Sequence, residues 1–331
     1  MPHATATILG AGAMGTALAT VLAQNKYKVT MWDIERDVVN GISRFHKNPR
    51  SLSDITLENA IKAEVDIITA VLGRDVVVIS VASGAVRQVA AQIKDSLSRN
   101  AVVVCASKGL ENKTFKTMPR VLLEELGTGF RYQIMQLSGP TFAEEIAAKT
   151  PTAAVLASER SNEYLKRAKV AFSNKWFKLS DTRDITGVAL SGVAKNALAV
   201  GSGIMAGLGY GQNTNSWILT EGFRELSRLI WTLGGSEQTV YGLAGFGDAL
   251  GTCFSPQSRN RTFGELIGSG KTVTAALQKV GQTVEGLSAI EALHLIAQKE
   301  KLRLPILSSL NEIVIERKKA DKVFKELIEN L

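Results

Sequence analysis

A single lysine, Lys195, lies in a stretch of small and apolar residues that has the composition of a buried helix. The stretch covers residues 187–200, and Lys195 is its only charged side chain. Burial costs an ammonium group its hydration and favours the neutral amine, so a lysine in this setting suits general acid/base chemistry. The alternative is a lysine whose stem is buried while its head group extends to water.

Two segments further along the chain carry groups that suit an anionic substrate. Residues 244–252 combine glycines, which allow close backbone approach, with Asp248, which could orient the lysine. Residues 255–261 include Arg259 and Asn260, which offer a planar fork of donors and an amide. Both groups suit a phosphate. A surface loop is the alternative for either segment.

Three glycines near the start of the chain form a Gly-x-Gly-x-x-Gly pattern at Gly10, Gly12 and Gly15. The pattern follows a β-branched run and opens an amphipathic stretch. In that context the glycines allow a tight turn, close approach of a ligand to the backbone, and packing of the helix on the strand. The N-terminus of the helix offers N–H groups and a positive dipole end to a pyrophosphate. We therefore predict a dinucleotide-binding turn; a glycine-rich turn without a ligand is the alternative.

Asp33 stands at the end of the second expected strand. An acidic residue at this distance from the turn accepts hydrogen bonds from the adenosine ribose and repels a 2′-phosphate. Arg36 lies about one helical turn later and could instead receive that phosphate. The sequence therefore favours NAD and leaves NADP possible, with a solvated loop aspartate as the alternative.

Two more segments follow expected strands, at residues 107–110 and 138–143. Ligands of open α/β sheets bind at the carboxyl ends of the strands. Lys108, in the first segment, is therefore a candidate ligand for an anion, although a loop lysine is also commonly just solvated.

The order of the expected elements predicts two domains. Short β-branched runs alternate with amphipathic stretches in the first half, which is typical of βαβ units in a parallel sheet. These runs lie at 5–9, 28–32, 76–81, 101–105 and 133–137, with helices at 13–24, 86–97 and 117–126 and further strands at 152–156 and 176–179. After about residue 182 helical patterns dominate, at 188–200, 215–233, 273–277, 286–299 and 322–331, and Pro305 opens another helix. We predict a Rossmann-type α/β domain over 1–183 and an all-α domain over 184–331.

Composition narrows the class of protein. Of the 331 residues, 45% are hydrophobic and 21% are charged, as in an ordinary globular protein. Cys105 and Cys253 cannot form a disulfide framework and lack metal-ligand spacing with the three histidines, so we expect no metal and a reducing compartment. The first residues lack the pattern of a secretory signal, and we expect a cytoplasmic location.

Charge and hydropathy bear on partners. The net charge of +8 is spread along the chain without a long basic run, so we expect no nucleic acid partner, although attraction of anions is the competing interpretation. The weakly charged stretch at 188–220 contains Gly, Ser, Asn and Lys195. We therefore expect a buried helix and loop there, with no integral membrane contact.

Taken in order, these motifs resemble those of soluble, bacterial-type NAD(P)-dependent glycerol-3-phosphate dehydrogenase, from Ile8 to at least Gly286. The motifs are Gly-Ala-Gly-Ala-Met-Gly at 10–15, Ser-Lys-Gly-Leu-Glu at 107–111, Ser-Gly-Pro-Thr-Phe-Ala at 138–143, Gly-Val-Ala-Lys-Asn at 192–196, Ala-Gly-Phe-Gly-Asp at 244–248 and Ser-Arg-Asn-Arg at 258–261. The resemblance implies a 6-phosphogluconate dehydrogenase-like fold and a cytoplasmic homodimer. It also implies interconversion of dihydroxyacetone phosphate and sn-glycerol 3-phosphate with NAD(P)H, supplying glycerol 3-phosphate for phospholipid synthesis.

The resemblance assigns roles at the matching positions. Lys195 would be the general acid/base at the substrate oxygen, with Lys108 the next candidate. The other implied roles are support of the lysine by Asn196, Asp248 and Thr252; substrate contacts by Lys108, Gly139 and Thr141; phosphate contacts by Ser258, Arg259 and Asn260; and cofactor contacts by Ala13, Met14, Lys108, Ala143, Arg259, Thr283 and Glu285. Many NADPH-preferring relatives carry a neutral and then a basic residue just after the second strand, where this chain has Asp33-Ile34-Glu35.

Two other functions compete with this one. A β-hydroxyacid or 6-phosphogluconate-type dehydrogenase would share the fold and a helix lysine followed by asparagine, but the Ser-Arg-Asn-Arg segment argues against it. A catalytically silent dinucleotide-binding protein is the other, and it would not need Lys195, Asp248 and Arg259.

Overall fold

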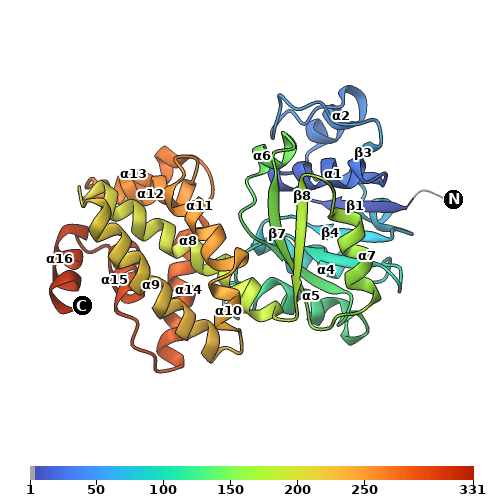
Figure 1. Cartoon of the computed structure of the whole chain (residues 1–331). Coiled ribbons are helices and arrows are strands. Elements are labelled where there is room, and N and C mark those ends of the chain that lie inside the picture. The colour runs from blue at the N-terminus through green and yellow to red at the C-terminus, as the bar shows by residue number, and fades with distance from the viewer. Residues whose placement is uncertain (1–3) are drawn as a thin grey trace. The chain divides into compact units, whose positions relative to one another are not determined.

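The computed structural model describes residues 4–331, which form two compact units. The N-terminal unit extends to Glu111 and continues over Lys116–Ile185. The C-terminal unit comprises Asn112–Phe115 and Thr186–Leu331. Figure 1 shows the elements of each unit, which we describe separately.

The N-terminal unit is built on a sheet of eight strands in the order β3-β2-β1-β4-β5-β6-β7-β8. Neighbouring strands pair in parallel except β6 and β7, which are antiparallel. The chain reverses direction across the sheet between β1 and β4, as in a Rossmann fold. This confirms the predicted Rossmann-type α/β class. The strands are β1 Thr5–Leu9, β2 Lys28–Trp32, β3 Ile61–Glu64, β4 Val76–Ile79, β5 Val102–Cys105, β6 Ile134–Ser138, β7 Thr152–Ser158 and β8 Phe177–Thr182.

Helices cover both faces of the sheet, which explains the apolar runs in the central strands. In β4, Val76 and Val78 belong to one apolar cluster, while Val77 and Ile79 belong to another on the opposite face. A strand that is buried on both faces has no polar alternation. The helices of this unit are α1 Ala13–Gln24, α2 Arg36–Phe45, α3 Ile67–Val71, α4 Val86–Ile93, α5 Met118–Leu126, α6 Ala143–Ala147 and α7 Glu163–Phe172.

Within the described residues, the regular elements of the C-terminal unit are all helices, which confirms the all-α expectation. Pro305 is the first residue of its helix, as predicted. The elements are α8 Ile185–Gly207, α9 Gln212–Thr232, α10 Glu237–Val240, the π-helical turn η3 Leu243–Gly247, α11 Asp248–Phe254, α12 Arg259–Gly268, α13 Val273–Val280, α14 Glu285–Lys299, α15 Pro305–Val314 and α16 Ala320–Asn330.

Helix α8 lies at the centre of the C-terminal unit. Within the described residues it is the one helix long and apolar enough to cross a membrane, but 94% of its most apolar window is buried inside the protein. Helix α12 crosses it in backbone contact. A Cβ atom added to Gly203 would lie 2.1 Å from the Arg261 carbonyl oxygen, and one added to Gly264 would lie 2.1 Å from the Val200 oxygen. Only glycine permits such an approach, so the two helices have little freedom to shift.

Some elements differ from the expected boundaries. The strand expected at 76–81 ends at Ile79, and the helix expected at 86–97 ends at Ile93. Residues 244–252 are helical in η3 and α11 instead of forming a surface loop, and Asp248 and Thr252 within them are buried.

Candidate active site

The glycine-rich turn connects β1 to α1 in a conformation that glycine alone tolerates. Gly10 has φ +105°, and a Cβ added there would lie 2.7 Å from the Ser80 carbonyl oxygen. A Cβ added to Gly15 would lie 2.0 Å from the Gly10 oxygen, so helix and strand pack closely. Gly12 is the N-cap of α1, and a Cβ added to it would meet nothing within 4 Å.

These features fit a dinucleotide pyrophosphate. Gly12 has no side chain with which to cap α1, so the N–H groups of the first turn can donate hydrogen bonds to a ligand. That first turn contains Ala13 and Met14, which are both partly exposed. Open space above Gly12 and the positive end of the helix dipole favour an anion at this point.

Asp33, at the carboxyl end of β2, is tied directly to this turn. Its Oδ2 accepts a hydrogen bond from the Ala11 N–H at 2.8 Å, and its Oδ1 accepts one from the Glu35 N–H at 3.0 Å. Each carboxylate oxygen can accept a second hydrogen bond. Asp33 is therefore oriented and able to receive ribose hydroxyls, while Arg36 begins α2.

The expected substrate residues of the N-terminal unit meet at one carbonyl group. The Gly139 oxygen accepts hydrogen bonds from Lys108 Nζ at 3.4 Å and from Thr141 Oγ1 at 3.0 Å. Gly139 has φ +132°, and a Cβ added to it would lie 3.0 Å from the Ala154 Cα atom. Ala143 follows as the first residue of α6. The segments after β5 and β6 thus place an ammonium and a hydroxyl together at the carboxyl edge of the sheet.

In the C-terminal unit, Lys195 lies in the middle of α8 with its side chain 13% exposed. Its Nζ donates to Asp248 Oδ1 at 2.6 Å and to Thr252 Oγ1 at 3.1 Å. The Thr252 hydroxyl in turn donates to the Asp248 carbonyl oxygen at 2.7 Å, one turn back in α11. The ammonium is therefore directed at a carboxylate that is only 3% exposed, so the alternative of a lysine that extends to water is wrong.

A chain of amide hydrogen bonds begins at Asn196, beside the lysine. Asn196 Nδ2 donates to Glu285 Oε2 at 3.2 Å, and its Oδ1 accepts from Asn260 Nδ2 at 2.9 Å. Asn260 Oδ1 accepts from the Gly286 N–H at 2.9 Å. The chain joins α8, α12 and α14, so it fixes the starts of two helices next to the helix that carries Lys195.

The start of α12 gathers the expected phosphate ligands. Ser258 is the N-cap, and its Oγ accepts from the Arg261 N–H at 3.3 Å. Arg259 NH1 donates to Gln282 Oε1 at 3.3 Å, and Gln282 precedes Thr283 in the segment that leads to Glu285. A helix N-terminus with an adjacent guanidinium suits a phosphate dianion.

Comparisons with known proteins agree with this geometry. Residues 5–164 match the family model for the N-terminus of NAD-dependent glycerol-3-phosphate dehydrogenase, and residues 184–325 match the one for its C-terminus. The chain belongs to the NAD-dependent glycerol-3-phosphate dehydrogenase family.

Individual members of the family are similar over nearly the whole chain. The enzyme named glycerol-3-phosphate dehydrogenase [NAD(P)+] from Staphylococcus epidermidis is 37% identical over 98% of this chain and 97% of its own length. That from Pseudoalteromonas translucida is 38% identical over 94% of this chain and 92% of its own length. The crystal structure of glycerol-3-phosphate dehydrogenase from Coxiella burnetii is 34% identical, covers 99% of both chains and superimposes with a TM-score of 0.91.

Family membership confirms the sequence-based prediction of function. The protein is an NAD(P)-dependent oxidoreductase that interconverts dihydroxyacetone phosphate and glycerol 3-phosphate, and the family implies a role in lipid metabolism.

Sequence reasoning missed two polar residues of this glycerol-3-phosphate dehydrogenase. Gln282, the partner of Arg259, precedes the expected Thr283 and stands in no motif. Asn48 is fully buried and reaches back to the glycine-rich turn, where Nδ2 donates to the Ala11 carbonyl oxygen at 2.7 Å. The only local signal is an asparagine followed by Pro49, a pair typical of turns.

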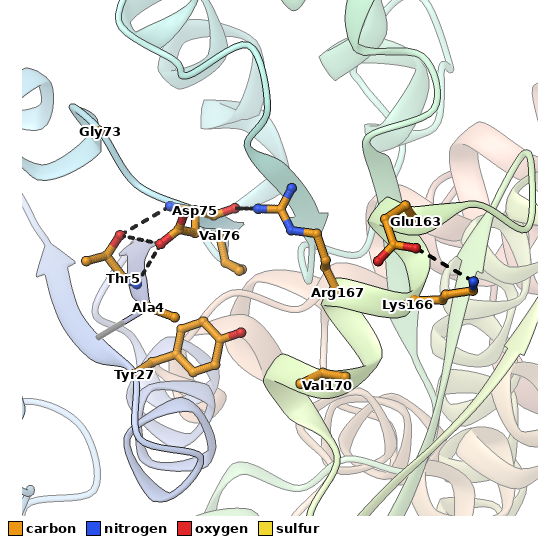
Figure 2. A pocket seen from close by; sticks show the side chains of 10 residues that line it. All are labelled: Ala4, Thr5, Tyr27, Gly73, Asp75, Val76, Glu163, Lys166, Arg167 and Val170. Carbon is orange, nitrogen blue, oxygen red and sulfur yellow. Dashed lines mark hydrogen bonds and ion pairs between the residues drawn. The ribbon is translucent and has the colours of Figure 1, made fainter. Parts of the chain in front are cut away.

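A separate cavity of about 600 Å³ lies near the start of β1 and β4 (Figure 2). Asp75 Oδ2 accepts hydrogen bonds there from Thr5 N and Oγ1 at 2.8 and 2.9 Å, and Arg167 donates to the Asp75 carbonyl oxygen at 3.5 Å. Lys166 pairs with Glu163 at 3.6 Å. These charged groups are bound by other groups of the protein, and the lining contains no expected site residue, so we place the chemistry at the opposite, carboxyl ends of the strands.

Proposed function

We propose that Lys195 donates the proton to the substrate oxygen when dihydroxyacetone phosphate is reduced, and accepts it in the reverse direction. The observation that carries this proposal is the 2.6 Å contact between Lys195 Nζ and the buried Asp248 carboxylate. The contact holds an ammonium in one orientation inside a helix of apolar residues. An oriented cation of this kind stabilises negative charge where it develops.

The nicotinamide of the bound cofactor supplies or accepts the hydride. As the carbonyl carbon is reduced, its oxygen gains charge that the Lys195 ammonium stabilises and then neutralises by transferring a proton. Asp248 and Thr252 keep the amine in place before and after transfer because both bond to Nζ. Asn196, the residue after Lys195 in α8, is held in place by its hydrogen bonds with Asn260 and Glu285.

The substrate phosphate is assigned to the N-terminus of α12. Arg259 offers a fork of N–H donors there. The Ser258 hydroxyl, which accepts a hydrogen bond from Arg261, can donate its own proton, and Asn260 Nδ2 has a second N–H besides the one that donates to Asn196. Binding at the phosphate, remote from the reacting carbon, orients the carbonyl. Lys108, Gly139 and Thr141 contribute further substrate contacts.

For the cofactor, we assign the pyrophosphate to Gly10, Gly12, Ala13, Met14 and Gly15, and the adenosine ribose to Asp33. Asp33 favours NADH over NADPH because a 2′-phosphate would approach a fixed carboxylate. Further cofactor contacts are assigned to Arg36, Lys108, Ala143, Arg259, Thr283 and Glu285. The proposed enzyme is a cytoplasmic homodimer, with domains 1–183 and 184–331, that supplies glycerol 3-phosphate for phospholipid synthesis.

The direct test is oxidation of NADH, followed by its absorbance, with dihydroxyacetone phosphate as substrate. Dihydroxyacetone, which lacks the phosphate, is the matched control and should turn over far less well. Equal or faster turnover of a 3-hydroxy acid in the oxidative direction would refute this substrate assignment.

A further inference from the structure

The end of the cofactor site assigned to ribose is enclosed by a closed ring of hydrogen bonds. The ring starts at Ala11, whose N–H donates to Asp33, and Asp33 accepts in turn from the Glu35 N–H. The Glu35 carboxylate binds Arg50 NH2 at 3.0 Å. The Arg50 N–H donates to Asn48 Oδ1 at 3.0 Å, and Asn48 Nδ2 returns to the Ala11 carbonyl oxygen. Arg50 is thereby linked to Asp33, the residue assigned to the ribose, through Glu35 on one side and through Asn48 and Ala11 on the other.

Asn48 makes this ring rigid because its amide is fully used. Nδ2 donates to the Ala11 oxygen at 2.7 Å and to Thr16 Oγ1 at 2.9 Å, while Oδ1 accepts from the N–H groups of Arg50 at 3.0 Å and Ser51 at 3.1 Å. The side chain is completely buried. With both protons and both lone pairs bonded, the amide has one orientation. The backbone of Arg50 is therefore fixed relative to the glycine-rich turn.

The guanidinium of Arg50 is shared by two acidic residues. It binds Asp37 Oδ2 through Nε at 2.7 Å and Glu35 Oε2 through NH2 at 3.0 Å. All three side chains are about half exposed, between 45% and 53%. Two carboxylates around one guanidinium give this group a net negative charge, and the Asp33 carboxylate adds a further negative charge nearby. A phosphate added at this edge would meet net repulsion even though two arginines, Arg36 and Arg50, lie nearby.

We propose that Arg50 is a specificity-determining residue for the cofactor, and that Glu35 and Asp37 keep it from pairing with a ribose 2′-phosphate. The inference rests on the proposed cofactor site and names the residues that discriminate within it. A substitution of Asp33 would not isolate cofactor specificity, because the Asp33 carboxylate also accepts hydrogen bonds from the Ala11 and Glu35 N–H groups. Replacing it loosens the turn that both cofactors share.

The test compares the dissociation constants of NADH and NADPH, which differ only in the 2′-phosphate and share the same nicotinamide fluorescence. The proteins are the full chain, the double variant Glu35→Gln/Asp37→Asn, and a triple variant that adds Arg50→Met. The double variant keeps side-chain size and leaves Arg50 without a carboxylate partner in this trio. Its ratio of NADPH to NADH affinity should rise roughly tenfold, the size of one charge-assisted hydrogen bond.

The triple variant should lose that gain, and added salt should diminish it in the double variant, because the new attraction is exposed and ionic. Lys318 offers a matched control, since it is shared by Glu312 at 3.0 Å and Glu316 at 3.2 Å, with side chains 36% to 51% exposed. Glu312→Gln/Glu316→Gln makes the same change in net charge and should leave the ratio unchanged.

An unchanged ratio in the double variant, or a gain that survives loss of Arg50, overturns the inference. A gain of the same size in the Lys318 control also overturns it, because net charge alone would then explain the effect. If the unmodified protein binds neither NADH nor NADPH, the proposed cofactor site fails and this inference fails with it. Binding of NADH with an unmoved ratio refutes the role of Arg50 only.

Discussion

The ion pair between Lys195 and Asp248 allows the catalytic role of the lysine to be separated from its contribution to stability. Lys195→Met keeps the approximate volume of the stem and removes the ammonium. It also leaves the Asp248 carboxylate, 3% exposed, without its 2.6 Å partner. Leaving one charge of a buried pair uncompensated costs about 3–5 kcal/mol of unfolding free energy. A general acid/base contributes about 10²–10⁴-fold to the rate, so kcat should fall by that factor in both directions.

A double-mutant cycle resolves the two effects. Asp248→Asn alone leaves the ammonium unpaired, and we expect a loss of stability similar to that of Lys195→Met. Lys195→Met/Asp248→Asn removes both charges, so its unfolding free energy, measured in urea, should recover part of the loss. Its kcat should stay as low as that of the single lysine variant. Stability should therefore recover in the double variant while kcat does not, which a purely structural lysine would not produce.

Binding of NADH, measured by fluorescence, is the internal control. The glycine-rich turn belongs to the N-terminal unit, so the dissociation constant should change little in all three variants. A folded Lys195→Met protein with near-normal kcat would refute the assignment and move the acid/base role elsewhere, with Lys108 the first candidate. A double variant no more stable than either single variant would refute the energetic argument about the pair.

Three further predictions test other parts of the site and the fold. Arg259→Lys should lower kcat/KM for dihydroxyacetone phosphate roughly tenfold or more, because lysine lacks the planar fork, and should change turnover of dihydroxyacetone much less; equal losses on both substrates would contradict the phosphate contact and leave Arg259 a role only at the cofactor or in the fold. Burial raises the pKa of Glu225 to about 7, against the opposing effect of hydrogen bonds from the Ile306 and Leu307 N–H groups. Because this folded-state pKa lies above the unfolded value, the protonated Glu225 carboxyl contributes stability to the fold. That contribution is fully present below about pH 4.5 and is lost as pH rises through 7. Urea unfolding at pH 5 and 8 should show a decline of up to about 3 kcal/mol that Glu225→Gln lacks, and identical declines would refute it. Gly264→Ala should cost about 1–3 kcal/mol because its Cβ would lie 2.1 Å from the Val200 oxygen, whereas Gly129→Ala, with nothing within 4 Å, should be nearly neutral in thermal unfolding.

The N-terminal sheet was readable from the sequence where a strand is buried on both faces. Val76–Ile79 and Val102–Cys105 are continuous apolar runs because helices cover both sides of them. The edge strand Ile61–Glu64 was missed because it carries Lys62 and Glu64 and has no apolar run. The hydrophobic pattern of a sequence detects strands whose side chains are buried, and few side chains are buried in an edge strand with two charged residues.

The helical unit shows a different limit. Residues 244–252 contain three glycines and are soon followed by Pro256, a composition that favours a loop by local propensity. Packing overrides that preference: a Cβ added to Gly245 would lie 2.0 Å from the Val240 carbonyl oxygen, so this glycine serves close contact and not flexibility. The sequence also cannot show that Asn48 contacts Ala11, 37 residues earlier, because nothing local distinguishes it from any asparagine before a proline.

The contacts of α8 leave the helices around Lys195 little freedom to rearrange. Backbone contact with α12 at Gly203 and Gly264 fixes the distance between the two helices, since any side chain there would overlap a carbonyl group. A Cβ added to Gly286 would lie 2.8 Å from the Asn196 carbonyl oxygen, so α14 is fixed against the same helix. The proposed proton donor on α8 and the proposed phosphate-binding end of α12 therefore belong to one rigid body. Because a misplacement of about 1 Å can cost about 10²-fold in rate, a shift between these helices should reduce kcat before it unfolds the protein.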